Sequence, residues 1–147
     1  MSNLIDRIRS ATGFCALEAA DDDQISAAQE KLDLRFSGDF IEYVKAFGAA
    51  SFDSRELTGV CSSKRLSVVA ATERARHYYL MFPHGLYVIE EPQIDHILIA
   101  QDKSGIIYSF GPSEKADIIA NSLYEYLFPE ADFSDNTKSG PPAKPEA

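Results

Sequence analysis

Apolar positions in the first third of the chain recur every three or four residues, the spacing of an amphipathic helix. Three such segments follow one another, separated by short polar or glycine-bearing breaks. The first starts near Leu4 and ends at Gly13, the second is "DDDQISAAQEKLDL", and the third lies between Ser37 and Gly48. The pattern therefore predicts three consecutive helices.

Residues at the ends of the second and third helices suit helix caps. Asp22 or Asp23 can cap the second helix, because a side-chain oxygen accepts hydrogen bonds from the free N–H groups of the first turn. Ser37 can cap the third helix, and Gly48 can adopt the left-handed conformation that stops it. The third helix is expected to bury an apolar face made of Phe40, Ile41, Val44 and Phe47.

The middle of the chain changes from the period of helices to that of strands. Residues 56–60 predict a short strand with a bend at Gly59, and a helix is expected to start near Ser67 and to be broken by Pro83. Three runs rich in β-branched and aromatic residues then predict strands, namely "GLYVIEE", "IDHILIAQ" and "GIIYSF". "DKSG" between the last two predicts a hairpin turn in which Gly105 has a positive φ.

The last patterned segment, "SEKADIIANSLYEYLF", predicts a helix capped by Ser113. Its expected apolar side consists of Ile118, Ile119, Leu123, Tyr126 and Leu127. Residues 129–147 are mostly Pro, Gly and polar residues, which predicts a disordered tail. Hairpin-linked strands flanked by helices predict an α+β fold, an antiparallel β-sheet with helices packed against it, in a single domain over residues 1–128.

The charge of the chain bears on the class of partner. The formal net charge is −9, and residues 81–147 hold 11 of the acids and only 4 of the bases. Nucleic-acid backbones require clustered Lys and Arg, so direct nucleic-acid binding is not expected. An acidic surface suits a basic protein partner, although net charge also serves solubility alone.

Candidate chemistry is sparse in the sequence. The three histidines and two cysteines have no metal-ligand spacing, and no nucleophile motif is present, so neither a metal, a cofactor nor an enzymatic activity is expected. Glu90 and Glu91 cannot form a catalytic pair, because adjacent residues on a strand point to opposite faces. They are interpreted either as a solvated rim that protects a sheet edge or as an acidic docking patch.

The sequence also indicates the cellular compartment in which the protein is expected. The two cysteines lie far apart, the first 20 residues contain no unbroken apolar run, and no apolar run approaches the length needed to span a membrane. A cytoplasmic protein with no membrane partner is therefore expected.

The order of these segments resembles the SUKH superfamily, the Smi/Knr-like immunity and adaptor domains. In "ISAAQEKLDLRFSGDFIEYVKAFGAASF", the matching positions are Leu32, Leu34, Phe36, Asp39, Phe40, Val44, Gly48 and Phe52. The hairpin "YVIEEPQIDHILIAQDKSGIIYSF" matches at Asp102, Gly105, Ile107 and Tyr108. The resemblance extends over about residues 22–128, with Ser37–Gly38 standing where the family typically has a proline.

The resemblance implies a bacterial immunity protein that binds a cognate toxin, possibly a nuclease, and blocks it without catalytic residues of its own. It also leaves open an intracellular adaptor of the same fold. The residues expected to face a partner, which would be a basic toxin, are Tyr87, Glu90, Glu91, Asp95 and Asp102. A second candidate patch consists of Asp21, Asp22 and Asp23, although a helix cap is the simpler interpretation of these residues.

Overall fold

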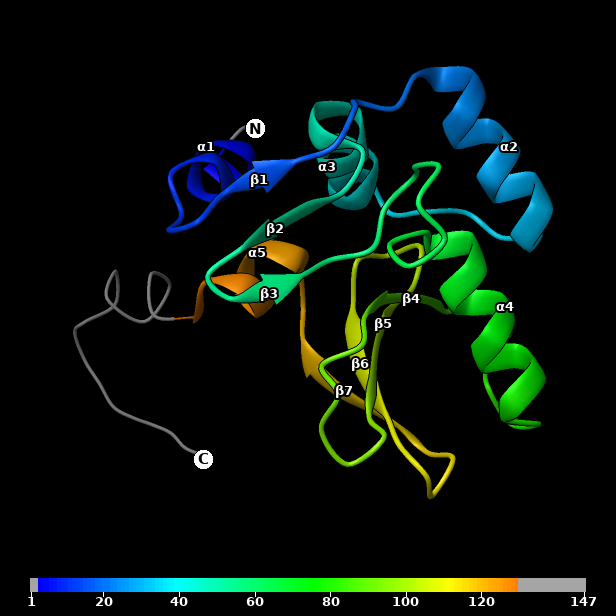
Figure 1. The fold of residues 1–147 in the computed structure, drawn as a ribbon. Helices are drawn as coiled ribbons and strands as arrows, with labels where there is room; N and C mark the ends of the chain where they lie inside the picture. The colour runs from blue at the N-terminus through cyan, green and yellow to red at the C-terminus, as the bar shows by residue number, and fades with distance from the viewer. Residues whose placement is uncertain (1–2, 130–147) are drawn as a thin grey trace.

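The computed structural model describes residues 3–129 and confirms the α+β fold (Figure 1). Its helices are α1 Asn3–Arg9, α2 Asp22–Leu32, α3 Gly38–Phe47, α4 Val68–Tyr78 and α5 Leu123–Leu127. Its strands are β1 Cys15–Ala16, β2 Ala50–Phe52, β3 Arg55–Glu56, β4 Tyr87–Glu90, β5 Leu98–Gln101, β6 Ile107–Phe110 and β7 Ala116–Ala120. The predicted tail, residues 129–147, lies outside the described residues apart from Pro129.

The strands form two antiparallel sheets, one with the order β1-β2-β3 and one with the order β4-β5-β6-β7. Figure 1 shows the smaller sheet at one end of the molecule with α1 and α3, and the larger sheet at the other end with α4 beside it. In the larger sheet, alternate side chains enter two different clusters, as the two-residue period of a strand requires. Tyr87, Ile99 and Ile107 join the main core with α2 and α3, whereas Val88 and Phe110 join a smaller cluster under α4.

The helix caps lie at, or next to, the residues that the sequence predicted. Ser37 caps α3, its hydroxyl accepting a hydrogen bond from the N–H of Phe40 at 3.3 Å, and Gly48 ends the helix with a φ of 72°. Asp21, one residue before the predicted cap, caps α2 in a reciprocal box with Gln24, at 2.9 Å in both directions. Asp22 and Asp23 lie in the first turn of α2, where carboxylates favour the helix dipole.

Two glycines let separate segments of backbone cross at close range. The N–H of Val60 donates to the carbonyl of Gly48 at 2.9 Å. A Cβ atom on Gly59 would lie 1.8 Å from that same carbonyl oxygen, closer than any real contact. The bend predicted at Gly59 is therefore a point where two segments of the same chain cross. No side chain fits there.

The C-terminal helix was predicted wrongly in its first half. Residues 116–120 form strand β7 beside β6, and the helix begins only at Leu123, with Ser122 rather than Ser113 as its cap. Ile118 and Ile119, assigned to a buried helical face, are exposed. The predicted strand over residues 56–60 is also shorter, because only Arg55–Glu56 pairs with β2.

Helix α4 confirms the prediction at its start, since Ser67 caps it, but it ends at Tyr78, five residues before Pro83. Within the part of the chain that is described, none of these helices combines the length and apolar character that crossing a bilayer requires.

A candidate protein-binding surface

Tyr87 lies in the core and cannot face a partner, which corrects the expectation from the sequence. Its side chain is fully buried. Its hydroxyl accepts a hydrogen bond from the N–H of Ser37 at 2.9 Å and donates one to the Gln101 amide oxygen at 2.8 Å. Burial raises the pKa of the Tyr87 hydroxyl far above its ordinary value. Tyr87 therefore holds the start of α3 against the sheet.

The half-buried carboxylate of Asp39 extends this network. Its Oδ1 accepts from the Gln101 amide at 3.0 Å, and its Oδ2 accepts from the N–H of Leu123 at 2.9 Å. One side chain thus ties the first turn of α3 to strand β5 and to the start of α5. Asp39 is one of the positions that matched the superfamily signature, and its contacts explain that match as structural.

Glu90 is also buried, so its predicted contact with a partner is corrected too. A register shift between Val88 and Glu90 turns the Glu90 side chain toward the interior, where only 5% of the residue is exposed. Its carboxylate accepts a hydrogen bond from the Tyr126 hydroxyl at 2.5 Å and lies 3.5 Å from the Arg55 Nε. Burial, together with that hydrogen bond, raises the pKa of Tyr126. These contacts make Glu90 an internal joint between the two sheets.

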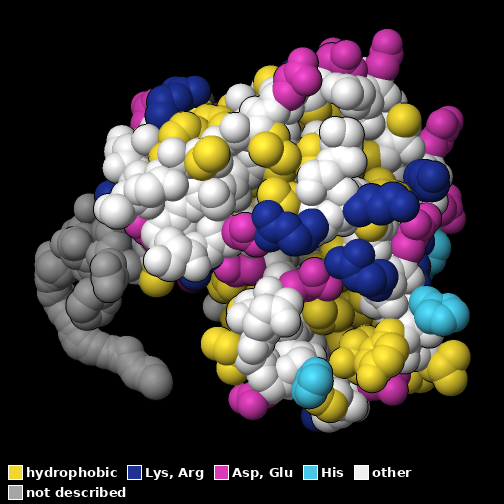
Figure 2. Space-filling model, in the orientation of Figure 1, with side chains coloured by type: hydrophobic (Ala, Val, Ile, Leu, Met, Phe, Trp, Pro, Cys, Tyr) yellow, Lys and Arg dark blue, Asp and Glu magenta, His cyan; other side chains and the backbone are white. Residues whose placement is uncertain are grey.

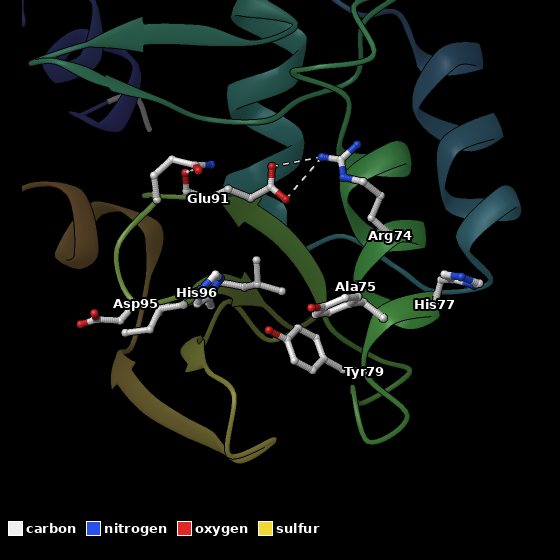
Figure 3. A pocket seen from close by; sticks show the side chains of 11 residues that line it. Arg74, Ala75, His77, Tyr79, Glu91, Asp95 and His96 are labelled. Atoms are coloured by element: carbon white, nitrogen blue, oxygen red, sulfur yellow. Dashed lines mark hydrogen bonds and ion pairs between the residues drawn. The ribbon is translucent and has the colours of Figure 1, made fainter.

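Glu91 and Asp95 do lie at the surface and share one groove of about 500 Å³ between α4 and the β4–β5 loop (Figure 3). The two carboxylate oxygens of Glu91 accept hydrogen bonds from Nη2 of Arg74 on α4, at 3.1 and 3.3 Å. Figure 3 shows this ion pair on one side of the groove and the Tyr79 ring on the other, with Asp95 and His77 pointing away. Glu91 is thus partly neutralised, while Asp95 offers an exposed charge on the outer rim.

The other predicted residues lie far from this groove and serve local structure. The Asp102 carboxylate accepts hydrogen bonds from two N–H groups of its own turn and from the Tyr108 hydroxyl at 2.8 Å. That hydrogen bond is the main cause of the raised pKa of Tyr108. The predicted turn conformation is confirmed, with a φ of 97° at Gly105. Asp21, Asp22 and Asp23 are exposed on α2, and whether they bind a partner stays a prediction.

Exposed apolar side chains gather at the end of the molecule that holds the groove. Seven large hydrophobic residues are exposed among those described, and all but Leu17 come from the end of α4, the β4–β5 loop and strand β7. We call these six residues the distal surface; they are Tyr78, Leu80, Met81, Ile94, Ile118 and Ile119. Leu80 and Tyr78 are 93% and 76% exposed. Clustering of this kind is typical of an interaction site, whereas single exposed apolar residues are ordinary.

The elements that carry the distal surface are joined and bordered by polar residues. The N–H of Met81 donates to the Glu114 carboxylate at 2.9 Å, which links the segment after α4 to the β6–β7 turn. Asp95 and Asp117 lie exposed beside the apolar residues. Figure 2 shows hydrophobic side chains gathered on the lower part of the molecule, below a band of mixed basic and acidic side chains. An apolar centre with a polar border is the usual composition of a protein–protein interface.

None of the six residues of the distal surface was predicted from the sequence to face a partner. The signal available was "YYLMF", a run of large apolar residues at the predicted end of a helix. Such a run is also expected in a core, and Tyr79 and Phe82 do pack on Phe110 with ring centroids at 5.3 and 5.1 Å. Only the tertiary structure separates these inward residues from their exposed neighbours.

A second cavity, of about 950 Å³, lies between the β2–β3 hairpin and the end of β4. Four of the charged groups that line it are paired with one another, Arg65 with Glu56 and Arg55 with Glu90. No group of three or more potential metal ligands occurs among residues 3–129. The cavity thus offers paired charges and no evident nucleophile.

Comparison with known proteins agrees with this architecture. The sequence profile described as SMI1-KNR4 cell-wall, SUKH_5, matches residues 1–130. No match is found among curated proteins. Four solved chains match, among them the crystal structure of a protein from Pseudomonas syringae pv. tomato, at a TM-score of 0.70 and 18% identity over 86% of this chain and 95% of that chain. That likeness shows the fold alone, while the profile covers most of the sequence. The chain therefore belongs to the SUKH superfamily of SMI1-KNR4 domains.

Proposed function

We propose that this protein is a bacterial immunity protein that binds a cognate toxin and blocks it by noncovalent occlusion in the cytoplasm. The family supports an immunity-type domain in general, and the distal surface is the observation that supports a protein partner for this chain. Its exposed tyrosine, leucine, methionine and isoleucine side chains would be buried in the complex, and burial of such groups supplies most of the affinity of an interface. The groove beside Tyr79 would receive a side chain of the toxin.

The charge of the chain favours a basic toxin. A net charge of −9 attracts a positively charged protein over about the last nanometre before contact, which accelerates association. Nucleases are basic where they grip phosphate, so a nuclease toxin is the class that this charge fits best. Asp95 and Asp117 border the distal surface and would meet such a partner first.

The carboxylates and thiols of this chain fit a binding role better than an enzymatic role. Two carboxylates that could have served acid–base chemistry are engaged in structure, since Glu90 bonds to Tyr126 and Asp102 stabilises its own turn. Cys61, one of the two thiols, has its pKa raised by burial, which disfavours the reactive thiolate. We therefore propose that the protein acts as a stoichiometric inhibitor.

The proposal is tested by capture and by protection. The full chain is used as bait in a lysate of its own organism, and the captured protein is identified and produced in a sensitive host. We expect the captured protein to arrest growth alone and to be harmless when the chain is co-expressed, with a complex of nanomolar affinity or tighter. Capture of a non-toxic cellular protein, with no growth arrest to relieve, would instead support the adaptor role and overturn the immunity proposal.

A further inference from the structure

The two edges of the larger sheet are treated differently by the fold. Along β4, the N–H and the hydroxyl of Thr58 donate to the carbonyls of Ile89 and Val88, both at 2.8 Å, so this edge is covered by the chain. Along β7, the hydrogen bonds of the ladder run to β6 alone among the described residues. An uncovered edge strand presents free N–H and C=O groups that can pair with another strand.

The uncovered edge is also the most suitable strand for pairing. At five residues, β7 is the longest of the strands described, and it contains two adjacent isoleucines, which favour extended backbone. Ile118 is 62% exposed, and the segment Ala116–Ala120 contains no proline or lysine. Natural edge strands are usually short, charged, bulged or covered, and β7 retains two of these protections, the carboxylate of Asp117 and a register shift opposite Ile107 and Tyr108. The stretch from Ala116 to Ile118 pairs with β6 in regular register and stays open to a further strand.

The register fixes which side chains an added strand would meet. Ile118 and Ala116 stand opposite Tyr108 and Phe110, on the face of the sheet that α4 partly covers. Asp117 stands opposite Ser109, on the other face. A strand added along β7 would therefore place apolar side chains beside Ile118 and, at the alternate positions on the other face, cationic side chains beside Asp117.

The net charge of the protein indicates which kind of molecule would pair with this edge. Two copies of the chain would each carry a net charge of −9, so pairing of β7 with β7 of a second copy is opposed by repulsion. A basic protein is attracted by the same charge. We propose that β7 accepts an extended segment of the partner protein in which apolar and basic residues alternate. The inference rests on the proposed function only for the basic character of the partner.

The test uses the full chain and a probe peptide, acetyl-Lys-Val-Lys-Val-Lys-Val-amide, with amide hydrogen exchange measured by NMR. At roughly ten times its Kd, the peptide should slow exchange of the outward amides of Ala116–Ala120 about tenfold, while amides of α2 that exchange by local opening stay unchanged. A matched peptide with N-methyl groups on alternate residues keeps the charge and composition but cannot complete the ladder. It should give no protection. Asp117→Lys should weaken binding of the lysine peptide and strengthen that of the corresponding Glu-Val peptide.

Several results would overturn the inference. One is the absence of slowing in β7, and another is equal slowing by the methylated peptide. Protection without peptide that rises with protein concentration would assign the edge to a second copy, and protection lost on removing residues 130–147 would assign it to the chain itself. Neutralisation of a toxin without pairing at β7 defeats this inference alone, whereas pairing with the peptide in a chain that neutralises nothing defeats only the immunity proposal.

Discussion

Tyr87 shows how one side chain can serve as a joint between three segments. Its ring packs against Phe36 and Phe40, with centroids at 4.8 and 5.1 Å, while its hydroxyl bonds both to the start of α3 and to β5. The sequence placed Tyr87 in a strand correctly but could not indicate which face of that strand is buried. The same limit applies to Glu90, whose orientation depends on a register shift that no local pattern reveals.

Replacing Tyr87 by phenylalanine tests this joint. Y87F keeps the ring but leaves the N–H of Ser37 and the Gln101 amide oxygen without their buried partner, which should lower the free energy of unfolding by about 1–3 kcal/mol. Urea denaturation followed by circular dichroism measures the loss. Y124F is the matched control, because the Tyr124 hydroxyl makes no hydrogen bond among residues 3–129, and it should change stability little. Equal effects of the two substitutions would contradict the assignment.

Buried tyrosines also predict a loss of stability in alkaline solution. Burial raises the pKa of Tyr43 and of Tyr87 above the ordinary value of 10.0. The folded state therefore keeps both protons at a pH where the unfolded chain loses them. Stability should be complete below about pH 10 and fall above it by up to about 1.4 kcal/mol per pH unit for each tyrosine. Urea denaturation between about pH 9 and pH 11 tests this, and a flat profile would contradict it.

At the scale of elements, the crossing of Gly48 and Gly59 determines how the first half of the chain meets the second. G59A would place a Cβ atom against the backbone of Gly48 and Ala49, so we expect a loss of about 3 kcal/mol or more, measured by thermal and urea denaturation. G85A is the matched control, since a Cβ atom there meets nothing within 4 Å. A tolerated G59A substitution would show that the crossing can open without cost.

Helices were predicted better than strands, for a physical reason. A helix satisfies its own hydrogen bonds, so caps such as Ser37 and Ser67 and the spacing of apolar residues mark it locally. A strand depends on a distant partner. The segment around Ile118 has apolar spacing that also fits a helix, and only its pairing with β6 makes it a strand. The short strands β1 and β2 were missed because two or three residues carry no period.

At the scale of the whole molecule, acidic side chains were predicted to attract the partner. The structure reduces the number of predicted acidic residues that can do so near the groove. Asp95 is exposed beside the groove, while Glu90 is buried and Glu91 is paired. The apolar residues of the distal surface could not be predicted, because exposure of Tyr78 and Leu80 depends on where α4 ends and what packs beside it. The net charge can thus be predicted from composition, whereas the residues that form an interface cannot.

Reversing the charge at Asp95 tests the role of electrostatics in association. D95K should slow association with the captured toxin about three- to tenfold at low salt, with little change in dissociation, because exposed charges act mainly on the approach. The difference should shrink as salt is added. E18K makes the same reversal at an exposed position just after β1, outside both predicted patches, and should have a smaller effect. Equal slowing by both variants would show that only the total charge matters.

The most direct measurement is the dissociation constant of the toxin complex for variants inside and outside the distal surface. Replacing Tyr78 and Leu80 together by alanine should weaken binding at least about thirtyfold, because a few anchors, tyrosines among them, carry most of the binding energy of an interface and Leu80 adds apolar area beside Tyr78. Leu17→Ala is the control, since Leu17 is the one exposed large hydrophobic residue among residues 3–129 that lies outside this surface. Unchanged affinity after the double substitution, or an equal loss with Leu17→Ala, would contradict binding through the distal surface.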